Sequence, residues 1–301
     1  MPDPAATHGL WADLHRPDST PADTDFSVLG VPYDGAACAR RGAALAPDRL
    51  RFWSQHLTPF TEERTPLAGL RICDLGDVRF TDQTRGFESV RSLVASLPNI
   101  PIVLGGDHSI SIPVFEAQRQ RFKAHRLGVL WLDAHPDLCD VFTGSRFSHA
   151  CVLRRAAEFG ISPEDICMIG LRSWEDQELD LIEHGGFRVF TAAQVAERGM
   201  KSVAREVRKV LARCGAVHIS TDIDCLDPAF APGTGIPEAA GLSTRDVLTL
   251  IKSMRSLPLV GLDLVEVAPP LDPSEATVFA ALKIIMEFVG LQAHIADSKG
   301  V

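Results

Sequence analysis

Residues 127–138 read LGVLWLDAHPDL, an apolar run that ends in two aspartates and one histidine. The first six residues are continuously apolar, which is typical of a short strand buried on both faces of a parallel sheet. Asp133, His135 and Asp137 follow at alternate positions. In an extended segment such residues share one face, so we expect their side chains to converge. Ligands of open α/β sheets bind beyond the carboxyl ends of the strands, so the stretch predicts a ligand site.

Short apolar runs recur along the whole chain and are separated by amphipathic segments, which indicates a parallel sheet covered by helices. The predicted strands are Phe26–Val31, Arg71–Leu75, Ile100–Leu104, Leu127–Leu132, Ile166–Gly170, Phe187–Phe190, Val217–Thr221 and Val260–Val267. The predicted helices are Gly86–Ser96, Ile112–Phe122, His149–Phe159, Glu175–His184, Val203–Cys214, Thr244–Ser256 and Ser274–Phe288. The segment Ser243-Thr-Arg-Asp246 resembles a helix capping box. We predict a single-domain, three-layer α/β/α fold with a mostly parallel sheet.

We place the domain at residues 26–301 and a flexible N-terminal arm at residues 1–25, which are rich in Pro, Asp and Thr. The arm is expected to pack against a neighbouring subunit. It has no basic and apolar regions of a secretory signal. No apolar run approaches the roughly 18 residues that a membrane helix needs, so no membrane association is expected. The seven cysteines are odd in number and lack CxxC spacing, which favours a reducing cytoplasm over a disulfide framework.

The formal net charge of −9 argues against nucleic acid as a partner, because phosphate binding needs clustered Lys and Arg. No basic stripe is present in the sequence. The acidity is compatible with a cationic small-molecule substrate, although many cytosolic proteins are acidic.

Two further polar clusters follow predicted strands: LGGDHS at residues 104–109 and STDIDCLDP at residues 220–228. The second places Asp222 and Asp224 at alternate positions. Four carboxylates held close together would repel one another and take up protons unless cations neutralise them. Together with the two imidazoles they form an oxygen-rich set, which suits Mn²⁺ better than a structural Zn²⁺ site.

The number of candidate ligands predicts two ions, which at a separation of roughly 3.5–4 Å can hold a bridging hydroxide. Four carboxylates and one hydroxide outweigh two divalent cations by one charge. Such a site is therefore expected to favour a cationic substrate.

The blocks GGDHS, DAHPD and STDIDCLDPAFAPGTGIPEAAGL resemble the three signature blocks of the ureohydrolase superfamily, which comprises arginases, agmatinases and their relatives. The similarity runs from about Phe26 to the last helix. It includes GVPYDG at residues 30–35 and RRGAALAPDRLR at residues 40–51, which resemble the substrate-side loop and first helix of the superfamily. The resemblance implies an α/β domain with a binuclear manganese centre that hydrolyses a guanidino compound to urea and an amine.

The resemblance also implies a role for each matching residue. One Mn²⁺ would be bound by His108, Asp133, Asp137 and Asp222, and the other by Asp133, His135, Asp222 and Asp224. Asp137 would also relay a proton to the leaving amine. His149 would shuttle protons at the mouth of the cavity, although Ala150 follows it where the family usually has Gly. Glu266 would bind the substrate guanidinium; an unpaired charge at the end of an apolar strand is otherwise costly.

The substrate is less sharply defined by the sequence. Arginases carry an NxHG segment after the DAHxD block, whereas residues 138–151 read LCDVFTGSRFSHAC and lack that Asn, so the agmatinase branch is favoured. The loop that contains Trp174 and Glu175 is expected to shape the far end of the substrate pocket. Glu175 or Asp176 would favour the distal amine of agmatine, whereas Arg172 or Arg146 would favour a carboxylate.

Agmatine is therefore the substrate that we predict from the sequence. The alternatives are a guanidino-acid ureohydrolase of the guanidinobutyrase or guanidinopropionase type, a formimino- or amidino-hydrolase, and a non-catalytic binding subunit. The resemblance further implies a homo-oligomer, either a trimer or a hexamer. Five residues near the blocks have structural interpretations: Asp107 and Asp227 as supporting groups, Cys151 and Cys225 as apolar packing, and Glu238 either at the entrance or bracing a loop.

Overall fold

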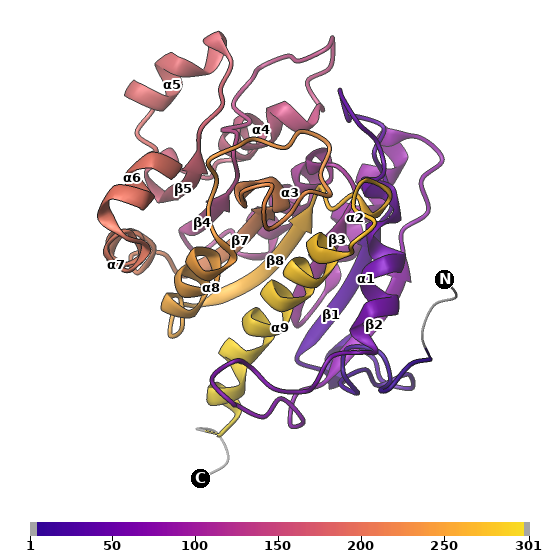
Figure 1. Ribbon diagram of the computed structural model, residues 1–301. Coiled ribbons are helices and arrows are strands. Elements are labelled where there is room, and N and C mark those ends of the chain that lie inside the picture. The colour runs from indigo at the N-terminus through magenta and orange to yellow at the C-terminus, as the bar shows by residue number, and fades with distance from the viewer. Residues whose placement is uncertain (1–4, 298–301) are drawn as a thin grey trace.

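The computed structural model describes residues 5–297, and these form three layers (Figure 1). The middle layer is a sheet of eight strands in the order β2-β1-β3-β8-β7-β4-β5-β6, and every neighbouring pair is parallel. The strands are β1 Phe26–Val31, β2 Ile72–Asp77, β3 Ile100–Gly105, β4 Leu127–Leu132, β5 Ile166–Leu171, β6 Arg188–Thr191, β7 Ala216–Asp222 and β8 Leu259–Val265. The predicted α/β class is confirmed, and the sheet is entirely rather than mostly parallel.

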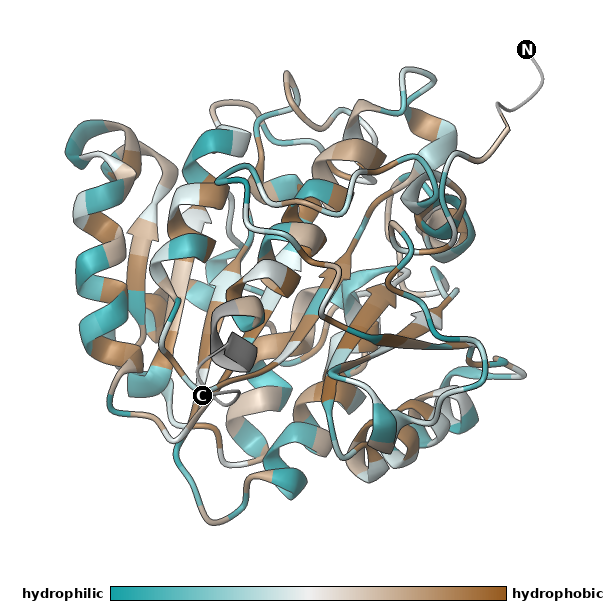
Figure 2. Cartoon of the chain, turned by 90° about the horizontal axis from the view of Figure 1, so that it is seen from below, coloured by the Kyte–Doolittle hydropathy of each residue, from teal (hydrophilic) through white to brown (hydrophobic). Residues whose placement is uncertain are grey.

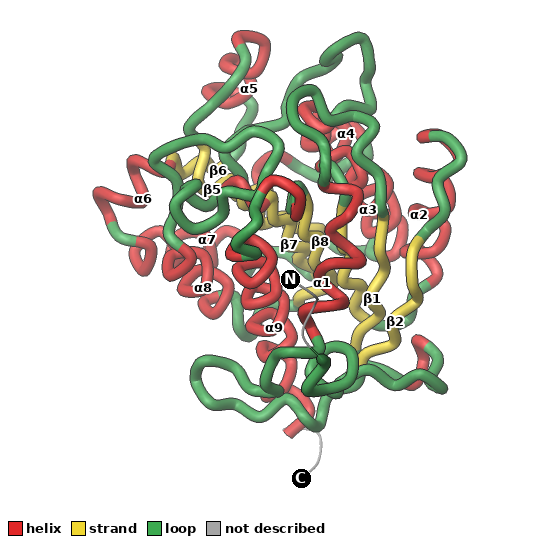
Figure 3. Tube along the Cα trace, turned by 45° about the vertical axis from the view of Figure 1, so that its right-hand side comes forward, coloured by secondary structure: helices red, strands yellow, loops and turns green. Residues whose placement is uncertain are grey.

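Helices cover both faces of this sheet (Figure 3). They are α1 Ala46–Ser54, α2 Gln83–Ser96, α3 Ser111–Arg121, α4 Val152–Glu158, α5 Leu179–His184, α6 Ala192–Arg198, α7 Met200–Leu211, α8 Thr244–Ser253 and α9 Ala276–Asp297. The apolar sides of α1, α6, α7, α8 and α9 form one core with the sheet, whereas α2, α3 and α4 pack on the other face. Figure 2 shows the resulting pattern, with hydrophobic strands inside and hydrophilic residues on the outer helix surfaces.

The central strands are continuously apolar because both of their faces are covered. All residues of β1, β4, β5, β7 and β8 are buried. Because every strand runs in the same direction, the carboxyl ends of β3, β8, β7 and β4 lie next to one another at one edge. The three signature blocks and Glu266 follow these four neighbouring strands, so the topology alone brings them together.

Several predicted boundaries differ from the structure for local reasons. Strand β8 ends at Val265 rather than Val267, because Glu266 turns the backbone with a φ of 61°. The predicted helix His149–Phe159 is a 3-10 turn, His149–Cys151, followed by α4, and the predicted helix Glu175–His184 is likewise a 3-10 turn followed by α5. The helix α6 was not predicted; it is short and begins with a capping box between Thr191 and Gln194. The capping box at Ser243 and Asp246 is confirmed.

The predicted flexibility of residues 1–25 is wrong for residues 10–15. Trp11, Ala12 and Leu14 are fully buried in the core. The Trp11 indole Nε1 donates a hydrogen bond to Asp74 at 2.8 Å, and His15 forms a parallel bridge with Ile72. The segment therefore packs on its own domain at the edge strand β2. Residues 1–4 of the predicted arm and the predicted domain end at residue 301 lie outside the described residues.

Within the described residues, one stretch of α9, Ala276–Ala293, is long and apolar enough by length and composition to cross a membrane. This corrects the expectation that no apolar run approaches such a length. However, 78% of the stretch is buried inside the protein. Packing of α9 against the sheet and its neighbouring helices accounts for its composition, as for other helices that are apolar on all sides.

Candidate metal centre

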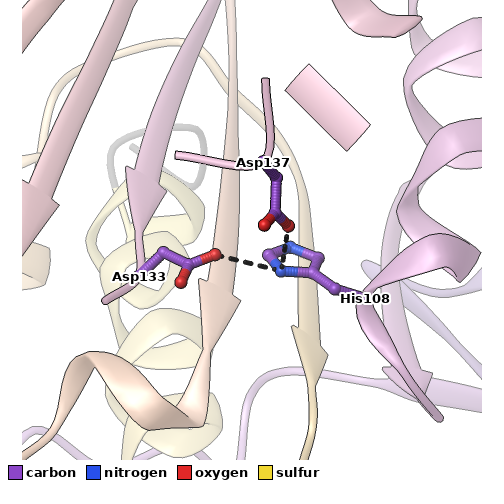
Figure 4. A group of neighbouring side chains, drawn as sticks. All are labelled: His108, Asp133 and Asp137. Carbon is purple, nitrogen blue, oxygen red and sulfur yellow. Dashed lines mark ion pairs between the residues drawn. The ribbon is translucent and has the colours of Figure 1, made fainter. Parts of the chain in front are cut away.

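Two histidines face the carboxylates at the carboxyl edge of the sheet. The Nδ1 atom of His108, which follows β3, lies 3.1 Å from Asp133, 3.3 Å from Asp137 and 3.2 Å from Asp222. Figure 4 shows His108, Asp133 and Asp137 pointing toward one another from different segments. The Nδ1 atom of His135 lies 3.4 Å from the other oxygen of Asp133 and 3.1 Å from Asp224. The structure thus brings five of the predicted ligands into two groups that share Asp133, and Asp222 joins the first group through its contact with His108.

The loops achieve this convergence by turning, and not by the extended alternation that the sequence suggested. Strand β4 ends at Leu132, and Asp137 has a φ of 50°. Asp133 accepts a hydrogen bond from the backbone N–H of His135 at 2.6 Å, and Asp222 accepts one from that of Asp224 at 2.8 Å. Each pair is therefore held by an Asx-type turn, in which a side chain caps the backbone two residues later. The spacing predicted the right residues for the wrong geometric reason.

The cluster is buried, and its carboxylates lie close enough to repel one another. Asp133, Asp137, Asp222 and Asp224 are at most 4% exposed. Burial and the nearby carboxylates raise the pKa of Asp137 and of Asp222 well above the usual value. Burial opposes ionisation of Asp133 as well, but His108 and His135 hold its pKa at about 2.

His108 Nδ1 and Asp133 Oδ2 are buried polar atoms without a hydrogen-bond partner. Buried polar atoms without a hydrogen-bond partner are rare in native proteins and need an explanation. Cations placed between the imidazole nitrogens and the carboxylates would satisfy both atoms and remove the repulsion. The donor set therefore fits a pair of divalent metal ions with a preference for oxygen and nitrogen ligands.

Glu266 stands beside this cluster at the end of β8. Its carboxylate accepts a hydrogen bond from the backbone N–H of His108 at 2.8 Å. Burial, followed by the nearby charge of Asp107, raises the pKa of Glu266 to about 8. Among the interactions of the described residues, no Arg or Lys side chain forms an ion pair with Glu266. The carboxylate lines the inner cavity, where a cationic group can reach it.

His149 lines both compartments of the cavity, of which Glu266 lines the inner one. Its Nδ1 is 2.7 Å from the backbone carbonyl of Ala36, which accepts only, so Nδ1 carries the proton and donates. The Nε2 lone pair is then available for a proton. Burial lowers the pKa of His149, so the neutral ring is favoured near neutral pH.

Two compartments lead to the cluster. The inner one, about 20 Å³, is lined by all the predicted ligands except Asp133, and by Glu266 and residues 37–40. The outer one, about 200 Å³, continues from His135 and His149 to Trp174, Glu175 and Glu238. Trp174 and Glu175, which the sequence predicted to shape the pocket, are among the residues that line this outer compartment. Asp176 and Arg146 are not among its lining residues.

Residues 37–40, with Cys38 on both compartments, form a wall that the sequence did not identify. The only signal was the resemblance of the segments on either side of it to a substrate-side loop. Glu238 lines the outer compartment, and its carboxylate is 3.9 Å from Nε2 of His135. Of the two interpretations of Glu238, the entrance is therefore supported.

The supporting groups behave as the sequence suggested. Asp107 accepts hydrogen bonds from the backbone of Ala36 and Ser109, and Asp227 accepts from Ala229 and Gly241. Cys151 and Cys225 are buried and unpaired.

Arg172 braces the site and does not point into the pocket as a free cation. Its guanidinium donates to the backbone carbonyls of Asp224 at 2.7 Å and Glu238 at 2.6 Å. It also donates to carbonyls at residues 170, 226 and 239. One planar group therefore ties the end of β5 to two loops, which a Lys ammonium cannot do because it has only three donors on one atom.

We expect Arg172→Lys to lower the melting temperature by several degrees, since losing two or three charged hydrogen bonds costs roughly 2–4 kcal/mol. The activity should also fall, by about tenfold in kcat/KM, because the loops of Asp224 and Glu238 loosen. Arg146→Lys is the matched control: Arg146 is half-exposed and pairs with Asp140 and Glu158. Thermal unfolding checks the pair, and equal shifts in the two variants would contradict the bracing role.

Comparisons with known proteins agree with this geometry. The sequence model described as the arginase family matches residues 24–290. The chain is 31% identical over 284 residues to an agmatinase from Proteus mirabilis, with 90% of this chain and 89% of that protein covered. It is 33% identical over 288 residues to a guanidinopropionase from Pseudomonas aeruginosa, with 92% and 89% covered.

A solved structure agrees with the fold as well. The proclavaminate amidino hydrolase from Streptomyces clavuligerus superposes with a TM-score of 0.87 at 33% identity, covering 96% of this chain and 98% of that one. The similarity in fold and sequence therefore extends over the three layers and all the residues of the cluster.

Proposed function

The chain belongs to the arginase family of hydrolases, and on that premise we propose that it cleaves the guanidino group of agmatine to urea and a diamine. The observation that carries the proposal is the pair of His Nδ1 atoms facing shared carboxylates beneath an acid-lined pocket. Agmatinases are among its relatives.

The proposed cofactor is two Mn²⁺ ions per subunit, held by His108, Asp133, His135, Asp137, Asp222 and Asp224. Bound there, the pair would supply a water molecule whose pKa is lowered toward neutrality, as the nucleophile for the guanidino carbon. The oxygen-rich ligand set supports Mn²⁺ over Zn²⁺.

The protein groups have separate tasks in this proposal. Glu266 binds the guanidinium with its carboxylate and fixes the carbon over the cluster, which turns an encounter into a positioned attack. Asp137 hands a proton to the nitrogen that leaves as the amine. His149 exchanges protons with solvent through its free Nε2.

The far end of the pocket supports a substrate with a second positive charge. Glu175 and Glu238 line the outer compartment, and no Lys or Arg side chain lines it within residues 5–297. Glu175 is held in place because its backbone N–H donates to the buried carboxylate of Glu178 at 2.7 Å. A carboxylate tail, as in a guanidino acid, would meet two like charges there.

The experiment is urea detection from Mn²⁺-loaded protein with agmatine, arginine, guanidinobutyrate and guanidinopropionate in parallel. A clear preference for agmatine is expected. Preference for a guanidino acid would replace agmatine by the alternative that the guanidinopropionase relative represents. Absence of urea from all four compounds would reject the ureohydrolase assignment in favour of an amidino- or formimino-hydrolase or a binding subunit.

We expect Glu175→Gln to raise the KM for agmatine about three- to fivefold at unchanged kcat, because a solvent-exposed ion pair contributes up to about 1 kcal/mol. The KM for guanidinobutyrate should stay level or fall. Asp176→Asn is the control, since Asp176 is adjacent in sequence but does not line the pocket. Steady-state kinetics with both substrates checks this. A rise in KM for both substrates would mean that Glu175 shapes the pocket and does not select charge.

We also propose that the protein is a cytoplasmic homo-oligomer, a trimer or a hexamer, that needs neither a membrane nor nucleic acid as a partner. The seven unpaired cysteines and the negative net charge support the location and the absence of nucleic acid. Light scattering coupled to size-exclusion chromatography would measure the oligomeric state.

A further inference from the structure

A continuous row of buried polar side chains lies behind His108, on the side away from the pocket. Ser220 and His218 alternate along β7, Asp263 is the register partner of Ser220 on β8, and Ser111 and Gln118 come from α3. All five are fully buried. The pocket does not reach them, and the proposed reaction gives them no role.

The contacts form one connected chain. His108 Nε2 lies 3.1 Å from the Ser220 hydroxyl, which donates to Asp263 Oδ1 at 2.6 Å. The Ser111 hydroxyl donates to the same oxygen at 2.8 Å. The other oxygen, Asp263 Oδ2, is 2.6 Å from Nε2 of His218.

The far end of the chain fixes the direction of its hydrogen bonds. The Gln118 amide nitrogen donates to the Val260 carbonyl at 3.0 Å and faces His218 Nδ1 at 3.1 Å, while its oxygen accepts from Arg121. Because an amide nitrogen can only donate, His218 Nδ1 must accept this hydrogen bond and therefore carries no proton. The proton of a neutral His218 is then on Nε2, where it is donated to Asp263.

The same logic fixes His108. The Ser220 proton is committed to Asp263, so the Ser220 oxygen must accept from His108, and the His108 proton is on Nε2. His108 Nδ1 is then a lone pair aimed at three carboxylates, and it has no hydrogen-bond partner. In the neutral ring this arrangement is repulsive, and either a second proton on Nδ1 or a metal ion between the groups removes the repulsion.

From this we propose that Ser220 and Asp263 are positioning residues that hold His108 in the tautomer whose Nδ1 binds a metal ion. The inference rests on the metal centre of the proposed function. On this proposal, metal affinity depends on these buried residues of the core as well as on the metal ligands themselves. Partners of this kind orient a ligand histidine and raise its basicity, and their loss typically weakens metal binding 10- to 100-fold.

Two serines provide a matched test, because their hydroxyls contact the same oxygen of Asp263 and only Ser220 touches His108. The metal-free wild type and the variants Ser220→Ala and Ser111→Ala are titrated with Mn²⁺ by calorimetry, and their thermal unfolding is measured without metal. We expect Ser220→Ala to bind Mn²⁺ about 10- to 100-fold more weakly. Ser111→Ala should stay within about threefold of the wild type at a similar loss of stability.

A second variant, Asp263→Asn, keeps the shape of the side chain but replaces one of its two acceptor oxygens with an NH₂ group that donates. If its amide nitrogen faces the serines, the Ser220 proton turns toward His108 and displaces the tautomer; if it faces His218, two donors meet. We expect a loss of Mn²⁺ affinity at least as large as in Ser220→Ala, and this variant decides the matter should Ser220→Ala fail to fold.

The outcomes separate the two proposals. A wild type that does not bind Mn²⁺ would reject the metal centre itself. A wild type that binds, together with unchanged affinity in Ser220→Ala and Asp263→Asn, would overturn the positioning role. Equal weakening of Mn²⁺ binding in Ser111→Ala and Ser220→Ala would also overturn the positioning role, because both serines would then act only through packing of the core.

Discussion

Asp224→Ala is expected to lower kcat with the preferred substrate by about a thousandfold or more, because a metal that activates water contributes several kcal/mol to the transition state. Asp224 Oδ2 lies 3.1 Å from His135 Nδ1, so its removal takes one carboxylate from the second group of ligands. We expect the bound Mn²⁺ to fall from two ions to about one per subunit. Metal analysis and steady-state kinetics on the same sample measure both effects.

The fold should survive this substitution, although it removes the hydrogen bond that Asp224 accepts from the buried backbone N–H of Ala134 at 3.1 Å and the contact with His135. It also removes a like charge that, after burial, raises the pKa of Asp222. Without metal, the lost contacts and the relieved repulsion oppose each other, so the variant should melt within a few degrees of the wild type. With Mn²⁺, the wild type should gain more stability than the variant, since a ligand that binds only the folded state stabilises it.

Asp227→Ala is the control within the same sequence block. Asp227 accepts backbone hydrogen bonds from Ala229 and Gly241 and is not part of the cluster. We expect it to cost stability in both metal states and to keep two Mn²⁺ ions. An Asp224→Ala protein that has lost metal and still turns over like the wild type would contradict the assignment.

How far the sequence could lead is clear from the four central strands. Their apolar runs predicted burial on both faces, and the polar residues just beyond them predicted the cluster, because parallel strands end at one edge. The reason given for the convergence of Asp133, His135 and Asp137 was wrong. The turn at Asp137 depends on φ values and backbone contacts that residue spacing does not specify.

The pocket walls could not be predicted in the same way. Cys38 is far from the signature aspartates in sequence, and only the packing of loops places it on one cavity with Glu238, for which the sequence left two interpretations open. The sequence offered Arg172 only as a group that would favour a carboxylate, but a guanidinium serves equally to join backbone carbonyls, as Arg172 does here. The polar residues His218 and Asp263 stood inside predicted apolar strands, and that anomaly was a usable signal of a buried network.

The second large effect concerns Glu266, which the chain presents to the inner cavity without a cationic partner among the described residues. We expect Glu266→Gln to lower kcat/KM about a hundredfold to several thousandfold. Removing one partner of a desolvated ion pair typically costs about 3–5 kcal/mol, and here the other partner is the substrate guanidinium. The amide keeps the shape of the side chain and loses its charge.

Glu266→Gln separates substrate binding from metal binding. The glutamine oxygen can still accept the hydrogen bond from the backbone N–H of His108, now 2.8 Å long, so the loop that carries this ligand should stay in place. Manganese content is therefore expected to remain at the wild-type value. Loss of metal together with activity would mean that Glu266 supports the cluster and does not bind substrate.

Glu287→Gln supplies the comparison for removal of a buried carboxylate. Glu287, on α9, is 3% exposed and accepts hydrogen bonds from Lys283 and from the backbone N–H of Glu62, away from the cavity. It should lower the melting temperature and leave kcat/KM within about twofold. Glu266 has no cationic partner among the described residues, and glutamine can keep its one hydrogen bond, from the backbone N–H of His108. Its substitution should therefore do the opposite, with little change in melting temperature and a large loss of kcat/KM. Opposite effects of the two substitutions on melting temperature and on kcat/KM are what we expect if the carboxylate of Glu266 binds a cationic substrate and that of Glu287 binds groups of the protein.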